Sequence, residues 1–139
     1  MILNNFLNLN EITPKNLEAI LEDACKVKKA TLGGSAFKER YSNCLNNTLT
    51  GLLFEKLSTR TRLSFEAAVL KLGGRALNLR KDEIHLGQGE TLEDTSAMFS
   101  LFLDVLVLRL YEEEKLYEFS RHSKIPIING LTNESHPCQ

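Results

Sequence analysis

Two arginines and three hydroxyl side chains are packed into the five residues Ser58-Thr59-Arg60-Thr61-Arg62. This stretch joins an apolar segment to a helix-like segment. The first turn of a helix leaves backbone N–H groups without partners and carries the positive end of the helix dipole, so an anion is stabilised there. The hydroxyls can donate to phosphate oxygens, and each planar guanidinium group can bind such oxygens two at a time. The pattern predicts a site for a doubly charged anion such as phosphate.

A purely structural alternative exists, in which Ser58 caps the helix and both arginines lie in solvent. Helices favour acidic rather than basic residues in their first turn, however. Arg60 and Arg62 therefore oppose the helix dipole unless an anion offsets their charge. This conflict favours anion binding over simple capping.

The elements that must position this stretch can be read from hydrophobic periodicity and from the Gly, Pro and Asn residues between them. Strands that alternate with helices predict an α/β fold, in which a parallel sheet of about four strands carries helices on both faces. The expected strands are 48–54, 75–79, 104–110 and 125–128, and the expected helices are 14–27, 61–72, 92–102 and 112–122.

Several local features refine this prediction. Residues 36–47 are polar and mixed, so no regular structure is expected there. The wide apolar surface of the 61–72 helix predicts that it is mostly covered by its neighbours. Thr91 and Asp94 have the spacing of a capping box, in which Asp94 reaches back to the backbone of Thr91. Pro126 predicts that the last strand lies near an edge of the sheet or begins at that point.

The carboxyl ends of the predicted strands carry further candidate residues. In an open parallel sheet the ligand site lies beyond these ends. His85 follows the second predicted strand, Arg109 ends the third, and His136 and Gln139 follow the fourth. Alone, Arg109 is equally well explained as a strand-end arginine, and His136 is better explained as a loop histidine. Their common position at one edge favours a site shared with Ser58 to Arg62.

The three cysteines are Cys25, Cys44 and Cys138, an odd and widely spaced set that argues against a disulfide framework. His136 and Cys138 are too few to form a tetrahedral metal site, and no metal is expected. A Cys–His nucleophile lacks the surrounding features that would activate it. A nucleotide-binding loop is also disfavoured, because the sequence contains neither common glycine-rich motif.

Composition restricts the broad class of protein. The 139 residues fit one domain with a substantial core, and 42% apolar with 25% charged residues is ordinary globular composition. A net charge of -1 gives no support for nucleic acid or an anionic membrane as a partner. The sequence shows neither a basic leader nor an apolar run of membrane-spanning length, so a cytoplasmic protein is expected.

Several of these motifs resemble the aspartate and ornithine carbamoyltransferase family. Residues 58–66 are similar to its carbamoyl-phosphate motif, and residues 136–139 are similar to its second motif. Cys138 within the second motif, together with residues 83–87 and 91–95, resembles the ornithine branch. The sequence departs from the family at Leu57, where a proline is usual and would stiffen the loop.

The resemblance implies a set of residues that bind carbamoyl phosphate. It also implies that residues 1–139 form the carbamoyl-phosphate-binding domain and that the family's second, ornithine-binding domain is absent from this chain. The implied catalytic residues are Arg60, Arg109 and His136. The implied substrate-binding residues are Ser58, Thr59, Arg60, Thr61, His85, Arg109, His136 and Gln139.

The activity implied by the resemblance is carbamoyl transfer to the δ-amine of L-ornithine, giving L-citrulline and phosphate in arginine metabolism, with no cofactor. The family also implies a homotrimer in which the His85 loop reaches a neighbouring subunit. The isolated chain is expected to turn over poorly. Two alternatives remain open: another transcarbamoylase, with aspartate or a modified ornithine as acceptor, and a non-catalytic anion-binding module. Whether His136 donates a hydrogen bond or acts as a base is also open.

Overall fold

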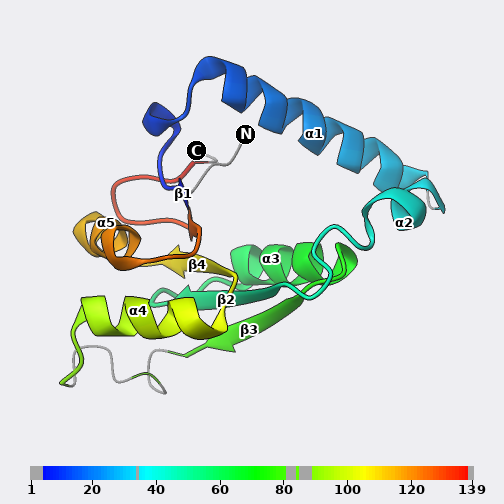
Figure 1. Ribbon diagram of the computed structural model, residues 1–139. Helices are drawn as coiled ribbons and strands as arrows, with labels where there is room; N and C mark the ends of the chain where they lie inside the picture. The colour runs from blue at the N-terminus through cyan, green and yellow to red at the C-terminus, as the bar shows by residue number, and fades with distance from the viewer. Residues whose placement is uncertain (1–4, 34, 81–83, 85–88, 138–139) are drawn as a thin grey trace.

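A computed structural model describes residues 5–33, 35–80, 84 and 89–137 of the chain. His85, Cys138 and Gln139 therefore lie outside the described residues (Figure 1). The strands are β1 (Asn5–Phe6), β2 (Leu49–Phe54), β3 (Arg75–Leu79), β4 (Val105–Arg109) and β5 (Ile127–Asn129). The helices are the short 3-10 helix η1 (Leu9–Glu11) and α1 (Pro14–Leu32), α2 (Ser35–Tyr41), α3 (Thr59–Lys71), α4 (Leu92–Phe102) and α5 (Glu113–His122).

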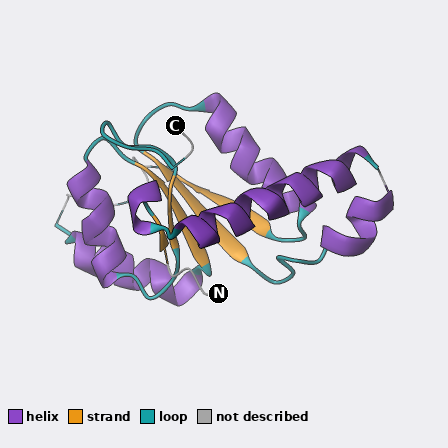
Figure 2. Cartoon of the chain, turned by 90° about the horizontal axis from the view of Figure 1, so that it is seen from above, coloured by secondary structure: helices purple, strands orange, loops and turns teal. Residues whose placement is uncertain are grey.

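The strands form one parallel sheet in the order β1-β5-β4-β2-β3. Right-handed crossovers in this order place α3 on one face and α4 with α5 on the other. Figure 2 shows helices on both sides of the sheet. The predicted fold class is confirmed, with five strands instead of about four. The additional strand, β1, has only two residues, too few to show an alternating pattern.

The core is centred on β4. Leu106, Val107 and Leu108 are at most 1% exposed, and Leu116 and Phe119 of α5 are fully buried beside the sheet. Complete burial of such a side chain contributes about 1.5–3 kcal/mol to stability. The carboxyl ends of β2, β4 and β5 are therefore held in position by a well-packed core.

Two helix starts follow the prediction from sequence. The hydroxyl of Thr13 accepts a hydrogen bond from Asn16 N at 3.3 Å, and Pro14 opens α1. The hydroxyl of Thr91 likewise accepts from Asp94 N at 3.1 Å. The Asp94 carboxylate differs from the prediction, because it accepts a hydrogen bond from the Thr91 hydroxyl at 2.7 Å and not from its backbone.

Two other predictions are wrong. Residues 36–47 are not wholly irregular, because α2 occupies their first part; Phe37 and Tyr41 lie one turn apart with ring centroids at 5.6 Å. The helix α3 is not mostly covered. Only Val69 is buried, whereas Leu63 is 54% and Leu70 is 73% exposed. One side of α3 faces the sheet, and its other apolar side chains remain on the surface of the described chain.

Pro126 predicted a strand that lies near an edge of the sheet or begins at the proline, and the second alternative is found. The strand begins directly after the proline and lies between β1 and β4, inside the sheet. Pro126 has no N–H to donate, but its carbonyl accepts a hydrogen bond from Leu106 N at 3.0 Å. Within the described residues, no helix is long and apolar enough to cross a membrane.

Candidate functional site

The amino end of α3 lies directly after the carboxyl end of β2. Ser58 is the N-cap residue, with an extended backbone, but its side chain makes no capping hydrogen bond. The first turn contains no acidic residue, and Arg60 and Arg62 are both exposed. Unused backbone donors, an uncommitted hydroxyl and two guanidinium groups thus occur together, as an anion site requires.

Arg109 reaches this turn from the end of β4. Its Nη1 donates to Thr61 Oγ1 at 3.2 Å and to the carbonyl oxygen of Gly130 at 3.0 Å. Its Nε is buried and has no hydrogen-bond partner among the described residues. Burial lowers the pKa of Arg109, although a guanidinium still carries its charge at neutral pH. The guanidinium of Arg109 thereby connects the end of β4 to the first turn of α3, which follows β2, and to the residue after β5.

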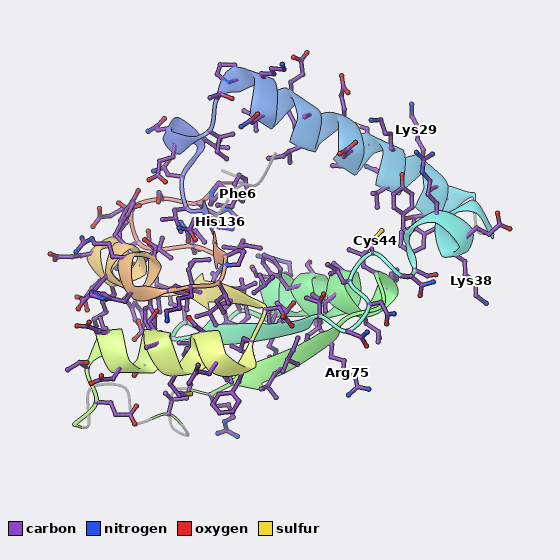
Figure 3. All side chains as sticks on the ribbon, in the orientation of Figure 1. Phe6, Lys29, Lys38, Cys44, Arg75 and His136 are labelled. Carbon is purple, nitrogen blue, oxygen red and sulfur yellow. The ribbon has the colours of Figure 1, made fainter. Side chains whose placement is uncertain are left out.

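His136 lies on the loop that follows β5. Figure 3 shows it beside the N-terminal segment that carries Phe6 and far from Cys44 and Arg75. Burial lowers the pKa of His136, and the nearby positive charge of Arg109 lowers it further. The imidazole is therefore mainly neutral at pH 7, when one ring nitrogen can donate a hydrogen bond.

A cavity of about 520 Å³ lies on the β3 side of the α3 start. Its lining includes the polar residues Lys56, Ser58, Thr59, Arg62, Asn78 and Arg80. Four further candidates, Arg60, Thr61, Arg109 and His136, lie outside this lining. The predicted residues are thus distributed around the α3 start, with the cavity on one side and the Arg109 contacts on the other.

Lys56 is a charged residue of this site that the sequence analysis missed. Its Nζ donates to Asn133 Oδ1 and lies 5.1 Å from the ring centroid of Tyr111. Burial lowers the pKa of Lys56, and the charge of Arg109 adds to the effect. Its position in the sequence could have indicated this role. Lys56 lies between the end of β2 and the start of α3, so it belongs to the same strand end as Ser58.

Glu55 also fastens this loop to its neighbours. Its backbone N donates to Arg109 O at 2.8 Å, and its Oε2 accepts from Tyr111 N at 3.1 Å. The turn that leads into α3 is therefore tied to the segment after β4 by backbone and side-chain bonds. Such ties fix the loop before any ligand is present.

The structure brings together most of the predicted residues that it describes. Thr61 accepts a hydrogen bond from Arg109, and the charge of Arg109 lowers the pKa of His136. Ser58 and Thr59 line one cavity. Arg60 stands in the same turn but is exposed. Cys25 and Cys44 are exposed free thiols. Within the part of the chain that is described, no three His, Cys, Asp or Glu side chains are grouped as a metal site would require.

Residues 4–139 match the family model described as aspartate/ornithine carbamoyltransferase, carbamoyl-P binding domain. The chain belongs to this family. The ornithine carbamoyltransferase of Caldicellulosiruptor saccharolyticus is 42% identical over 99% of this chain and 43% of its own length. That of Methanopyrus kandleri is 41% identical over 98% of this chain and 42% of its own length.

Solved structures agree with this family assignment. The ornithine carbamoyltransferase from Pyrococcus furiosus superposes with a TM-score of 0.89 at 34% identity, over 97% of this chain and 42% of that one. The catalytic subunit of M. jannaschii aspartate transcarbamoylase gives 0.83 at 29% identity, over 97% and 43%. The chain spans less than half the length of the carbamoyltransferases it matches, and both branches of the family share its fold.

Proposed function

We propose that this chain binds carbamoyl phosphate at the amino end of α3 and supplies that half of a carbamoyl transfer to L-ornithine. One observation carries the proposal: Arg109, from the end of β4, bonds to Thr61 within the first turn of α3. This contact joins two predicted binding elements that are 48 residues apart in sequence. Membership of a carbamoyl-phosphate-binding family supports the identity of the anion.

The phosphate would lie against the backbone N–H groups of the first α3 turn and the hydroxyls of Ser58, Thr59 and Thr61. Arg60, Arg109 and His136 would surround the carbonyl oxygen, where negative charge develops as the tetrahedral species forms. Preorganised donors at such an oxygen lower the barrier by several kcal/mol. The lowered pKa of His136 favours a neutral hydrogen-bond donor at pH 7 over a protonated acid.

The transfer itself forms one bond and breaks one. The neutral δ-amine of ornithine attacks the carbamoyl carbon, the bond from that carbon to the phosphate oxygen breaks, and the nitrogen loses a proton to the released phosphate or to water. The products are citrulline and phosphate, so the reaction would belong to arginine metabolism, and it would need no cofactor. Holding both reactants in register removes much of the entropic cost of their encounter.

Ornithine is the proposed acceptor because the Caldicellulosiruptor saccharolyticus and Methanopyrus kandleri relatives are named ornithine carbamoyltransferase. The proposal includes a second, ornithine-binding domain, and residues 1–139 serve as the carbamoyl-phosphate-binding domain. Gln139 would hold the carbamoyl amide. In a homotrimer, His85 would reach a neighbouring subunit's site. The exposed apolar side chains of α3 and α4, such as Leu70 at 73% and Leu101 at 78%, are consistent with such an assembly.

Calorimetric titration of the chain with carbamoyl phosphate tests the first step. Saturable binding by the wild type and a large loss of affinity in Arg60→Ala are expected, because Arg60 supplies a charged donor to the bound anion. An unaltered affinity in Arg60→Ala would remove that residue from the site. Absence of any binding by the folded wild type would refute the proposal.

The acceptor needs a second experiment. The chain is joined to the remaining portion of the Caldicellulosiruptor saccharolyticus enzyme, and citrulline and phosphate are measured with ornithine or aspartate as acceptor. Citrulline formation supports the proposal. Activity with aspartate would favour the other branch, which the structural similarity to the M. jannaschii enzyme makes the second candidate. Binding without acceptor-dependent phosphate release would favour a non-catalytic anion-binding module.

A further inference from the structure

The loop that carries His136 begins at a buried asparagine. Asn129 ends β5 and is 2% exposed. Its Nδ2 donates to Leu7 O at 3.0 Å and to Ser135 O at 3.3 Å, while its Oδ1 accepts from Leu131 N at 2.8 Å. One side chain thus links the N-terminal segment, the beginning of the loop and the residue before His136.

Thr132 closes the same loop from within, and it is also 2% exposed. Its Oγ1 accepts from Glu134 N at 3.2 Å and from Ser135 N at 3.0 Å. Its backbone N donates to Ser135 O at 3.0 Å. The chain therefore folds back on itself immediately before His136, and buried groups maintain that turn.

The loop conformation is strained and needs such support. Leu131 has φ 125°, a region that favours glycine. Its backbone N bonds to Asn129, and its carbonyl oxygen accepts from Leu110 N at 3.1 Å. The carbonyl of Gly130 accepts from Arg109 at 3.0 Å. The conformation of the loop is therefore coupled to the position of the Arg109 side chain.

We propose that Asn129 and Thr132 are positioning residues, which hold the His136 loop folded beside Arg109 so that the imidazole is set before the ligand arrives. The inference rests on the proposed function. Neither residue is proposed to touch the substrate; both act through His136. A donor fixed in advance needs no reorganisation when charge develops in the transition state.

The environment of His136 gives a readout that does not depend on a ligand. Burial is the main cause of its lowered pKa, and Arg109 is the charged group that adds to it. If the loop loosens, the imidazole gains contact with water and its pKa returns upward toward 6.5. A loss of stability that leaves the loop intact would not have this effect.

The test compares variants of the chain by NMR titration of the His136 ring proton, assigned by its disappearance in His136→Gln. Thr132→Val removes the hydroxyl with little change of shape, and Thr132→Ser retains it. Ser96→Ala is the matched control, because Ser96 is 1% exposed and its hydroxyl donates to a backbone oxygen, Phe119 O at 3.0 Å, between α4 and α5.

Thr132→Val is expected to raise the pKa of His136 toward 6.5 and to weaken carbamoyl-phosphate binding about tenfold. Thr132→Ser and Ser96→Ala should keep the wild-type values. A folded Thr132→Val with an unchanged pKa of His136 would overturn the proposal. If Thr132→Val does not fold, Ser135→Ala decides on the same criterion, since it removes the Oγ that lies 3.4 Å from Asn129 Nδ2.

Failure of the proposed function would be recognised separately. If the folded wild type bound no carbamoyl phosphate, that result would count against the proposed ligand. The pKa comparison would still decide whether Thr132 positions His136, because it needs only the free chain.

Discussion

Replacing Arg109 by lysine should weaken binding without removing the charge. Arg109 uses Nη1 for two hydrogen bonds, to Thr61 and Gly130, and its buried Nε has no partner among the residues that the structure describes. A lysine ammonium is compact and cannot reproduce the planar fork that serves both neighbours and a ligand. A hydrogen bond to a charged group is worth about 1.5–3 kcal/mol, so losing one from the ligand should raise Kd roughly 10- to 150-fold.

The assay is calorimetry of Arg109→Lys with a phosphonate analogue of carbamoyl phosphate. Arg75→Lys is the control, because Arg75 is exposed at the amino end of β3 and lies far from His136 (Figure 3). The control should bind like the wild type. If Arg109→Lys bound within about twofold of the wild type, a change of only some 0.4 kcal/mol, the role given to the guanidinium would be refuted.

Three further predictions concern single groups. Ser58→Ala should change the free energy of unfolding by less than about 0.5 kcal/mol in urea titrations, because Ser58 makes no capping bond, yet it should weaken carbamoyl-phosphate binding in calorimetry. The pKa of His136 is lowered below 6.5, so the unfolded chain binds this proton more tightly; wild-type stability relative to His136→Gln should fall as pH drops through 6.5, and equal pH profiles would contradict this. Tyr117→Phe should lose about 1 kcal/mol of unfolding free energy, because the phenol donates to Glu11 at 2.6 Å. Absorbance titration should find the Tyr117 pKa raised to about 12, and a value near 10.0 would show that this contact is absent.

The sequence was informative wherever one physical rule dominated. The apolar run that forms β4 predicts a strand buried on both faces, and its residues 106–108 are buried. Thr13 with Pro14, and Thr91 with Asp94, mark the starts of α1 and α4. The convergence of Thr61, Arg109 and His136 follows from the rule that parallel strands end at one edge.

Other features depend on contacts that periodicity does not encode. Strand order is set by which surfaces pack, and β1 is too short to be recognised by pattern. The apolar residues of α3 predicted burial, but a helix can present such residues on a surface that the described chain leaves exposed. The role of Lys56 depends on Tyr111 and Asn133, which are distant in sequence.

The long helix α1 extends as an arm above the sheet (Figure 1). None of its 19 residues is buried. Most helical stability in proteins comes from tertiary packing, which α1 largely lacks, so its conformation depends mainly on its local bonds. Its amide protons should consequently exchange with deuterium through local fraying, long before those of β4, which require global unfolding. Within one continuous fold, the arm and the sheet should thus behave as separate cooperative units.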